Sequence, residues 1–147
     1  MAFFKRVYPM YEQLRLSNQI CFPLYAISKE IVRKYSPFLD ELDLTYPQYL
    51  VMLVLWEFGE QSVGEIGDKL HLDSGTLTPL LKRLQSKDLI ARTRSQTDER
   101  TVIITLTNQG RALEHQAVNI PNQVADCLTL TADEVAVLQK IASQLNH

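Results

Sequence analysis

The sequence predicts a mainly α-helical fold with one small two-stranded β element, and three observations support this prediction. Apolar residues recur at helical spacing through most of the 147-residue chain. Three segments carry the capping-box pattern that begins a helix. After Leu89 the apolar pattern changes to the alternation typical of strands. The length suits a single domain over residues 1–147.

The first predicted element is a long helix over residues 9–36, whose apolar side chains follow helical spacing and include many aromatic rings. Pro37 disfavours helical backbone at Ser36 and indicates that the helix ends there. A domain of this size cannot easily cover such a helix. We therefore expect it to pair with a second copy of the chain.

Three capping boxes mark the starts of further helices: Thr45–Gln48, Ser62–Glu65 and Thr131–Glu134. The first begins a strongly apolar helix that runs to about Phe58 and is followed by Gly59 in a left-handed conformation. The second predicts a short helix over residues 63–70, and the third predicts a final helix over residues 132–145. Thr107 is expected to cap another helix that runs to about Cys127, with an interruption near Pro121.

The central segment predicts a winged helix-turn-helix over about residues 45–107. Asp73 and Ser74 begin a helix with one leucine stripe (Leu77, Leu80, Leu81 and Leu84), directly after the short helix. Residues 90–94 and 101–106 then predict two strands joined by a polar turn. A helix pair followed by such a hairpin is a winged helix. About residues 1–44 and 108–147 are then predicted to be dimerisation helices.

Composition excludes several classes of protein and concentrates positive charge in one segment. Residues 82–111 carry seven basic and three acidic side chains, a net charge of +4 in a chain whose overall charge is −2. Such a basic segment is a candidate surface for phosphate groups. The three histidines are scattered and the two cysteines lie far apart, so we expect no metal site, cofactor or disulfide scaffold. No segment resembles a leader or a membrane span, so we expect a cytoplasmic protein that binds no membrane.

The helix that begins at Ser74 has an outer face suited to the major groove of double-stranded DNA. Its hydroxyl side chains are short, and two basic residues follow one to two turns later; the face comprises Ser74, Thr76, Thr78, Lys82 and Arg83. In the hairpin, Arg94 and Arg100 flank a tip narrow enough for the minor groove. We expect Asp98 to hold the Arg100 guanidinium in place. A merely solvated face is the alternative, and winged helices without DNA binding exist.

Several stretches carry a family resemblance. Residues 73–84 (DSGTLTPLLKRL), Asp88-Leu-Ile90 and Asp98-Glu-Arg100 resemble the MarR family of repressors. Residues 18–25 (NQICFPLY) and 44–49 (LTYPQY) resemble its organic-hydroperoxide-sensing, OhrR-like branch, and the likeness runs through nearly the whole chain. The resemblance implies a homodimer that binds a pseudo-palindromic operator and releases it when an organic hydroperoxide oxidises a cysteine. Asp88 stands where many members have glycine, which should change only the turn.

Cys21 lies among apolar residues in the middle of the first predicted helix, where it is either a small buried hydrophobe or a peroxide sensor. Tyr25 follows one turn later on the same face, as a pocket neighbour or a core residue. Tyr35 is about 21 Å further along a straight helix, so it reaches Cys21 only from an antiparallel partner or after a kink. The resemblance implies that Tyr35 and Tyr46 contact the sensing cysteine across the dimer.

Cys127 is either a core residue or a resolving thiol that condenses with oxidised Cys21 to a disulfide. The resembled branch has one-cysteine and two-cysteine subclasses, and this sequence fits the second, with a bond expected between subunits. Two other functions stay open. One is a thiol peroxidase, which the helix-rich pattern disfavours, so we expect no enzyme. The other is a MarR-type repressor that a small phenolic ligand releases from DNA, without cysteine chemistry.

Overall fold

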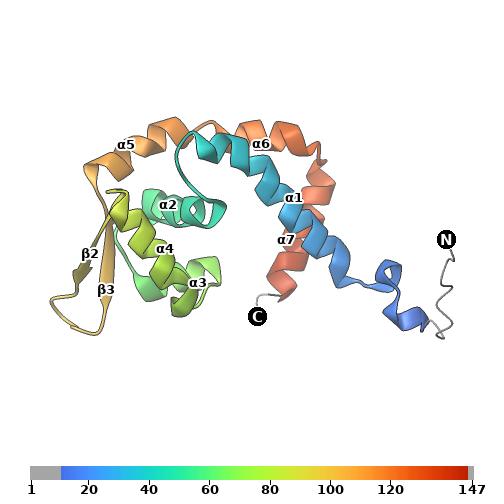
Figure 1. Ribbon diagram of the computed structural model, residues 1–147, viewed down its shortest axis with the longest axis horizontal. Helices are drawn as coiled ribbons and strands as arrows, with labels where there is room; N and C mark the ends of the chain where they lie inside the picture. Colours follow the sequence, from blue (N-terminus) through green and yellow to red (C-terminus); the bar gives the residue numbers. More distant parts are fainter. Residues whose placement is uncertain (1–10, 146–147) are drawn as a thin grey trace, which may run out of the picture. The chain divides into compact units, whose positions relative to one another are not determined.

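The computed structural model describes residues 11–145 and divides into two compact units, one that ends at Arg33 and one that begins at Lys34. The first unit contains two short 3-10 turns, η1 (Glu12–Leu14) and η2 (Leu16–Asn18), and most of helix α1 (Cys21–Asp40). The second unit contains the remaining elements (Figure 1): α2 (Tyr46–Phe58), β1 (Gln61–Ser62), α3 (Val63–Leu70), α4 (Ser74–Ser86), β2 (Ile90–Arg94), β3 (Val102–Leu106), α5 (Asn108–Ala117), α6 (Ile120–Leu128) and α7 (Ala132–Leu145).

The predicted start of the first helix is wrong within the described residues. Helix α1 begins at Cys21, and residues 9 and 10 of the predicted helix lie outside the described part of the chain. The preceding segment is held in turns by its own side chains, because the Asn18 amide donates to the Glu12 carbonyl at 2.7 Å and the Gln19 amide donates to two others. Such side-chain bonds compete with helical hydrogen bonds for the same carbonyls.

The predicted break at Pro37 is also wrong, because α1 continues through this residue to Asp40. A proline inside a helix removes one backbone hydrogen bond and crowds the preceding turn. Leu39, in the last turn, is 1% exposed and belongs to the hydrophobic core. We infer that burial of this last turn offsets the lost hydrogen bond.

All three capping boxes are present. The Thr45, Ser62 and Thr131 hydroxyls each accept the backbone N–H three residues on, at 3.4, 3.2 and 3.3 Å respectively. In return Gln48, Glu65 and Glu134 accept the backbone N–H of the capping residue. Gly59 follows α2 with φ +72°, although its ψ of −139° lies outside the left-handed helical region. Local hydrogen bonds therefore fix the starts of α2, α3 and α7.

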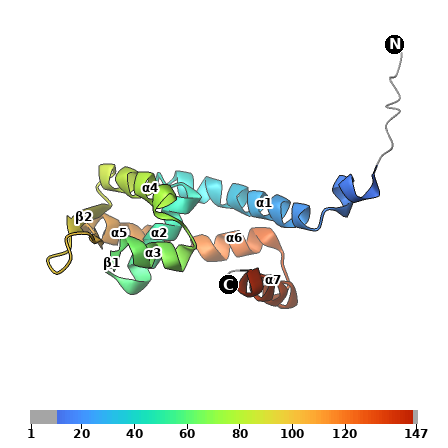
Figure 2. The ribbon, with the colours of Figure 1, turned by 90° about the horizontal axis from the view of Figure 1, so that it is seen from below.

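The β element is a three-stranded antiparallel sheet in the order β1-β3-β2, so the predicted hairpin has an additional strand. Strands β2 and β3 pair from Ile90 opposite Leu106 to Arg94 opposite Val102. Strand β3 begins one residue later than predicted. Residues 95–101 close the hairpin, and we call this loop together with β2 and β3 the wing. The wing tip extends beyond the helices of this unit in Figure 1, and Figure 2 shows it projecting from a second direction.

The hydrophobic core of the second unit fixes how α4 is presented. Three of the four leucines in the predicted stripe, Leu77, Leu81 and Leu84, are almost fully buried, whereas Leu80 is partly buried. They belong to the same core as apolar residues of α2, α3 and the sheet. Because one face of α4 is buried, its opposite face, with Ser74, Thr76, Lys82 and Arg83, lies at the surface.

The segment after the wing contains two helices where one interrupted helix was predicted. The Thr107 hydroxyl caps α5 by accepting the Gly110 N–H at 3.0 Å. Helix α5 ends at Ala117, and α6 begins at Ile120 with Pro121 in its first turn, where proline is well tolerated. Helix α7 has the predicted bounds. Asp88 adopts φ +58°, a left-handed conformation in which glycine is the more usual residue.

Candidate DNA interface and thiol site

Helix α4 begins with a well-formed cap that orders the proposed DNA-facing surface. The Asp73 carboxylate accepts the Thr76 N–H at 2.8 Å and the Thr76 hydroxyl at 3.2 Å, and these bonds lower the pKa of Asp73. The Thr78 hydroxyl donates to the Ser74 carbonyl at 2.7 Å. Thr76 and Thr78 therefore spend their hydroxyl protons within the helix and present mainly acceptor lone pairs outward.

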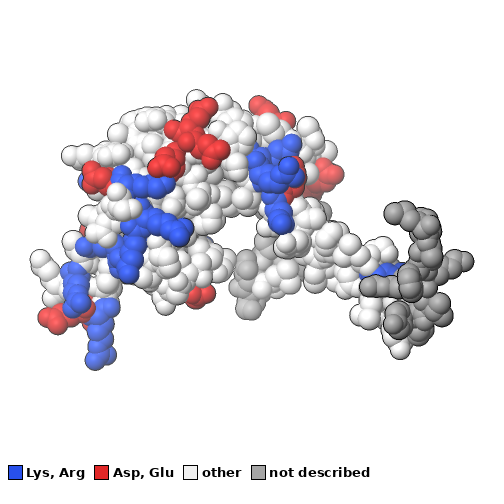
Figure 3. Space-filling view, viewed as in Figure 1, with Lys and Arg blue, Asp and Glu red and all other residues white. Residues whose placement is uncertain are grey.

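The basic residues predicted to face DNA all lie on the second unit, along α4 and the wing. Lys82 and Arg83 are exposed on α4, Arg94 is exposed at the end of β2, and Arg100 is exposed in the wing loop. Figure 3 shows lysine and arginine side chains gathered over α4 and the wing. The structure thus combines the predicted hydroxyl face and the predicted arginines in one unit.

Asp98 stabilises the wing differently from the sequence prediction. Its carboxylate accepts the backbone N–H of Arg100 at 3.0 Å and the hydroxyl of Thr101 at 3.2 Å. Within residues 11–145 no ion pair joins this carboxylate to the Arg100 guanidinium, so that expectation is wrong. Two short polar side chains in a tight turn favour bonds to the local backbone. Asp98 orders the loop that carries Arg100 and leaves the guanidinium exposed.

The wing also borders a cleft that the sequence did not reveal. It has a volume of about 400 Å³ and lies between the starts of α3 and α4 and the wing. Its polar lining includes Arg92, Arg100, Ser62, Ser74 and Thr78. The Nε atom of Arg92 is buried there without a hydrogen-bond partner. The sequence analysis counted Arg92 only as part of the basic segment, since its burial depends on the sheet.

Three tyrosines meet where the end of α1 joins α2. The ring centroids of Tyr35 and Tyr46 are 4.8 Å apart, and Tyr49 lies 5.7 Å from Tyr35 and 6.4 Å from Tyr46. Burial raises the pKa of all three phenols, that of Tyr49 to about 12, and mutual repulsion of the phenolates adds to the effect at Tyr46 and Tyr49. These groups therefore remain protonated hydrogen-bond donors at neutral pH.

The tyrosine cluster confirms that Tyr35 and Tyr46, distant in sequence, share one location. Tyr49 was missed as a third member, although it follows Tyr46 by three residues and so lies on the same face of α2. Tyr25 is not part of this cluster. It is 60% exposed in the first unit, with the Lys29 amine 5.3 Å from its ring centroid, so it is not a core residue of this chain.

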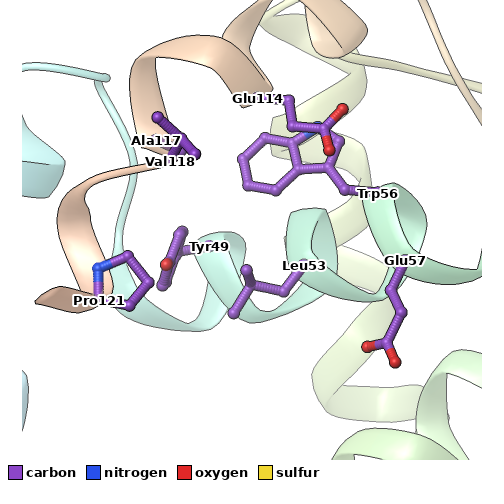
Figure 4. Close-up of a pocket in the computed structure, with 8 residues that line it drawn as sticks. All are labelled: Tyr49, Leu53, Trp56, Glu57, Glu114, Ala117, Val118 and Pro121. Atoms are coloured by element: carbon purple, nitrogen blue, oxygen red, sulfur yellow. The ribbon is translucent and has the colours of Figure 1, made fainter.

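A second cavity, of about 380 Å³, lies beside the tyrosine cluster. Tyr49 and Pro121 lie at one end of it, and Trp56 lies with Glu114 at the other, as Figure 4 shows. The indole N–H of Trp56 donates to the Gly110 carbonyl at 3.0 Å, which ties α2 to α5. The cavity is largely apolar, and two carboxylates, Glu57 and Glu114, also line it.

Both cysteines carry free, exposed thiols. Cys21 is the first residue of α1, so the expected position in the middle of a helix is wrong. Cys127 is the penultimate residue of α6. Their exposure argues against a core role for either residue within one chain. They belong to different compact units.

The described part of the chain offers neither a metal site nor a membrane span. Residues 11–145 contain no group of three or more histidine, cysteine or acidic side chains able to hold a metal ion. None of their helices combines the length and the hydropathy needed to cross a bilayer.

Comparison with known proteins identifies the family. Residues 33–116 match the family described as Transcriptional regulator SarA/Rot. The chain is 50% identical over 114 residues to the organic hydroperoxide resistance transcriptional regulator of Bacillus subtilis, a match that covers 78% of each protein. Two solved structures of AbfR, a protein of Staphylococcus epidermidis, are also similar.

The two AbfR structures differ in state. Reduced AbfR bound to DNA is 38% identical with a TM-score of 0.78, and disulfide-formed AbfR is 37% identical with a TM-score of 0.65. Each comparison covers 92% of this chain and 96% of the other. The family match extends over more than half of the chain and over the helices and wing that form the candidate interface. The chain is therefore a MarR-family winged-helix transcriptional regulator of the SarA/Rot type.

Proposed function

We propose that this regulator is a homodimeric repressor that binds a pseudo-palindromic operator and releases it when an organic hydroperoxide oxidises Cys21. The observation that carries the proposal is the joining of Tyr35 and Tyr46, two buried protonated phenols, in a chain whose Cys21 thiol is exposed. The 50% identity to an organic hydroperoxide resistance regulator supports the same conclusion.

DNA binding is assigned to α4 and the wing. Ser74, Thr76 and Thr78 with Lys82 and Arg83 form the face that enters the major groove, and Arg94 or Arg100 enters the minor groove. Asp98 contributes by ordering the backbone of the wing loop. AbfR, which has been crystallised on DNA, shares this fold at a TM-score of 0.78.

Homodimer formation is assigned to the terminal helices, over about residues 1–44 and 108–147, with residues 45–107 as the DNA-binding region. One chain leaves many apolar side chains exposed on these helices, among them Phe22, Leu24, Ile27, Val135 and Val137. Helix α7 has no buried residue at all among those described. Exposed apolar surface of this extent is typical of a protein–protein interface.

The proposed sensing reaction begins at Cys21, which is the first residue of α1. Backbone N–H groups in a first turn have no helical acceptor, and such positions stabilise anions. The thiolate attacks the peroxide, the O–O bond breaks, and the departing alkoxide takes up a proton to become an alcohol. Cys21 is left as a sulfenic acid. We assign this chemistry to the cytoplasm, where thiols begin reduced.

The tyrosines of the partner chain are assigned as hydrogen-bond donors to the Cys21 sulfur. Tyr35 and Cys21 belong to the same helix and are separated by about 21 Å along it, so contact requires the partner's copy. Tyr35 and Tyr46 supply the two phenol O–H groups, and Tyr25 lies one turn from Cys21 as a neighbour of the same pocket.

Cys127 is assigned as the resolving thiol. Its sulfur attacks the sulfenic sulfur of Cys21, a disulfide forms, and the hydroxyl departs as water. Formation of the bond requires Cα atoms within about 7 Å, so helices must move if the reduced cysteines are farther apart. Such a movement would displace the two DNA-binding regions from half-sites about 34 Å apart. AbfR, which has been solved in a disulfide-formed state, supports this assignment.

Operator release in the absence of Cys21 is the test of the sensing residue. A gel-shift titration against DNA upstream of the protein's own gene should show that cumene hydroperoxide releases the wild type but not Cys21→Ser. Release of the Cys21→Ser protein would overturn the assignment. Tyr35→Phe and Tyr46→Phe should raise the hydroperoxide concentration needed for release, whereas Tyr49→Phe, in the same cluster, should not.

Non-reducing electrophoresis tests the resolving thiol. After peroxide treatment the wild type should give a dimer-sized band that dithiothreitol removes, and Cys127→Ser should not. Absence of that band from the wild type would contradict an intersubunit disulfide.

A second candidate is release by a small apolar ligand, such as a neutral phenol, which the cavity of about 380 Å³ beside Tyr49 and Trp56 favours. Glu57 and Glu114 disfavour an anionic ligand there. Trp56 is the sole tryptophan, so its fluorescence reports on this cavity. A phenol that shifts this fluorescence and releases Cys21→Ser from DNA would favour this candidate over the thiol switch.

A further inference from the structure

The cleft between α3, α4 and the wing has the character of an anion site. Two arginines, Arg92 and Arg100, line it, together with the hydroxyl residues Ser62, Ser74, Thr78 and Thr101. No carboxylate is among the described residues that line it. Glu65, Asp73 and Asp98 lie nearby, but each accepts backbone N–H groups of its own cap or turn. The cleft therefore presents positive charge and hydroxyl groups together.

Arg92 is held in the cleft in a way that suggests a missing partner. It lies on β2 opposite the fully buried Ile104 of β3, so the sheet fixes its backbone. Its Nε atom is buried and has no hydrogen-bond partner among the described residues. Buried donors in native proteins are nearly always satisfied, and an exception calls for a functional explanation.

We propose that this cleft binds one phosphate of the operator backbone, with Arg92 as its principal donor. The inference rests on the proposed DNA-binding function and adds a site and a residue that the sequence did not assign. Arginine suits this role because its fixed fork of N–H groups matches the geometry of phosphate oxygens. The first N–H groups of α3, at Val63 and Gly64, have no helical acceptor and border the same cleft.

The position of the cleft favours a phosphate of DNA over a free anion. Helix α4 is proposed to enter the major groove and the wing tip the adjacent minor groove. In B-DNA one backbone strand separates two adjacent grooves, so this strand must pass between α4 and the wing. The cleft lies in that position, with Ser74 on one side and Arg100 on the other. Arg92 thereby sets the distance between the two elements on DNA without reading any base.

The salt dependence of DNA binding by the full-length dimer tests the proposal. Loss of one phosphate contact reduces the slope of log K against log salt by about 0.9, so loss in both protomers should reduce it by about 1.8. Arg92→Met should show this change and bind the operator about tenfold more weakly. It should weaken binding to unrelated DNA equally, and Arg92→Lys should recover part of both changes. Arg111→Met, which removes a charge from α5 away from the cleft, should stay within about twofold of the wild type.

Each outcome decides one part of the proposal. A wild-type slope in Arg92→Met would overturn the phosphate site while leaving the DNA-binding function intact, and failure of the wild type to bind would overturn both. The thermal midpoint of Arg92→Met should be no lower than that of the wild type, because its buried donor has no partner to lose. A lower midpoint with no recovery of the slope in Arg92→Lys would instead assign Arg92 to the fold. Inorganic phosphate at constant ionic strength should leave the wild-type midpoint unchanged, and stabilisation equal to that by DNA would indicate a free-anion site.

Discussion

The junction between α5 and the wing has no space for a side chain at Gly110, so Gly110→Ala should destabilise the second unit. A Cβ atom there would lie 2.0 Å from the Leu89 carbonyl oxygen and 3.2 Å from a Leu106 methyl group. The same Leu89 oxygen accepts the Thr107 N–H at 3.1 Å, so it cannot turn away without breaking that bond.

The magnitude follows from the displacement required. Ordinary contact with the Leu89 oxygen needs a separation of 3.4 Å or more, so α5 would have to move by about 1.4 Å from the start of β2. Overpacking of this kind costs about 1–3 kcal/mol, and the upper end applies because the obstacle is backbone. Loss of the Trp56–Gly110 hydrogen bond would add about 1 kcal/mol. The higher helix propensity of alanine returns about 1 kcal/mol. The expected loss is therefore about 3 kcal/mol.

Urea unfolding at fixed protein concentration measures this loss, with Trp56 fluorescence and far-ultraviolet circular dichroism as probes. At an m-value of about 2 kcal/mol/M the midpoint should fall by about 1.5 M. Gly64→Ala is the matched control, because a Cβ atom there meets nothing nearer than the Ser62 hydroxyl at 3.9 Å. That variant should be as stable as the wild type or more stable by about 0.5–1 kcal/mol. An unchanged midpoint in Gly110→Ala would refute the close-packing argument.

Three further predictions concern individual residues. Burial raises the pKa of Tyr49 to about 12, so absorbance at 295 nm should show a phenol that titrates there and is absent from Tyr49→Phe. Because this pKa is raised on folding, its contribution to stability is present below pH 10 and should be lost as the pH rises from about 10 to 12. The Thr76 N–H lowers the pKa of Asp73, so the cap contributes above the ordinary carboxyl pKa and weakens as the pH falls through the lowered value. Thermal midpoints should therefore fall less on acidification in Asp73→Asn than in the wild type, and an equal fall would contradict the cap. Asp88 has φ +58°, so Asp88→Gly should raise the free energy of unfolding by up to about 1 kcal/mol in urea titrations, and a loss would show that the turn is not strained.

Local signals made most helices predictable. A capping box requires only residues three apart, so Thr45, Ser62 and Thr131 identified the starts of α2, α3 and α7 correctly. The leucine stripe of α4 identified its buried face, because helical periodicity and burial coincide there. The family resemblance correctly brought together Tyr35 and Tyr46, and the comparisons confirm the family itself.

Features that depend on distant contacts were not predictable in the same way. Strand β1 has two residues and forms only because Gln61 and Ser62 pair with β3, more than forty residues later. The periodicity of residues 9–36 gave no sign that Asn18 and Gln19 would hold the preceding segment in turns, and Pro37 gave a local signal that the buried Leu39 outweighs. Arg92 looked like any other basic residue until the sheet placed its Nε atom in a buried position.

The central claim is that oxidation of a cysteine controls the DNA grip of this regulator. Fluorescence anisotropy of DNA from upstream of its own gene tests this most directly, with the reduced protein, the protein after cumene hydroperoxide, and the oxidised protein after dithiothreitol. Tight binding, release and recovered binding, in that order, are the results expected for the wild type, with no release in Cys21→Ser. Equal affinity before and after peroxide treatment of the wild type would contradict the thiol switch.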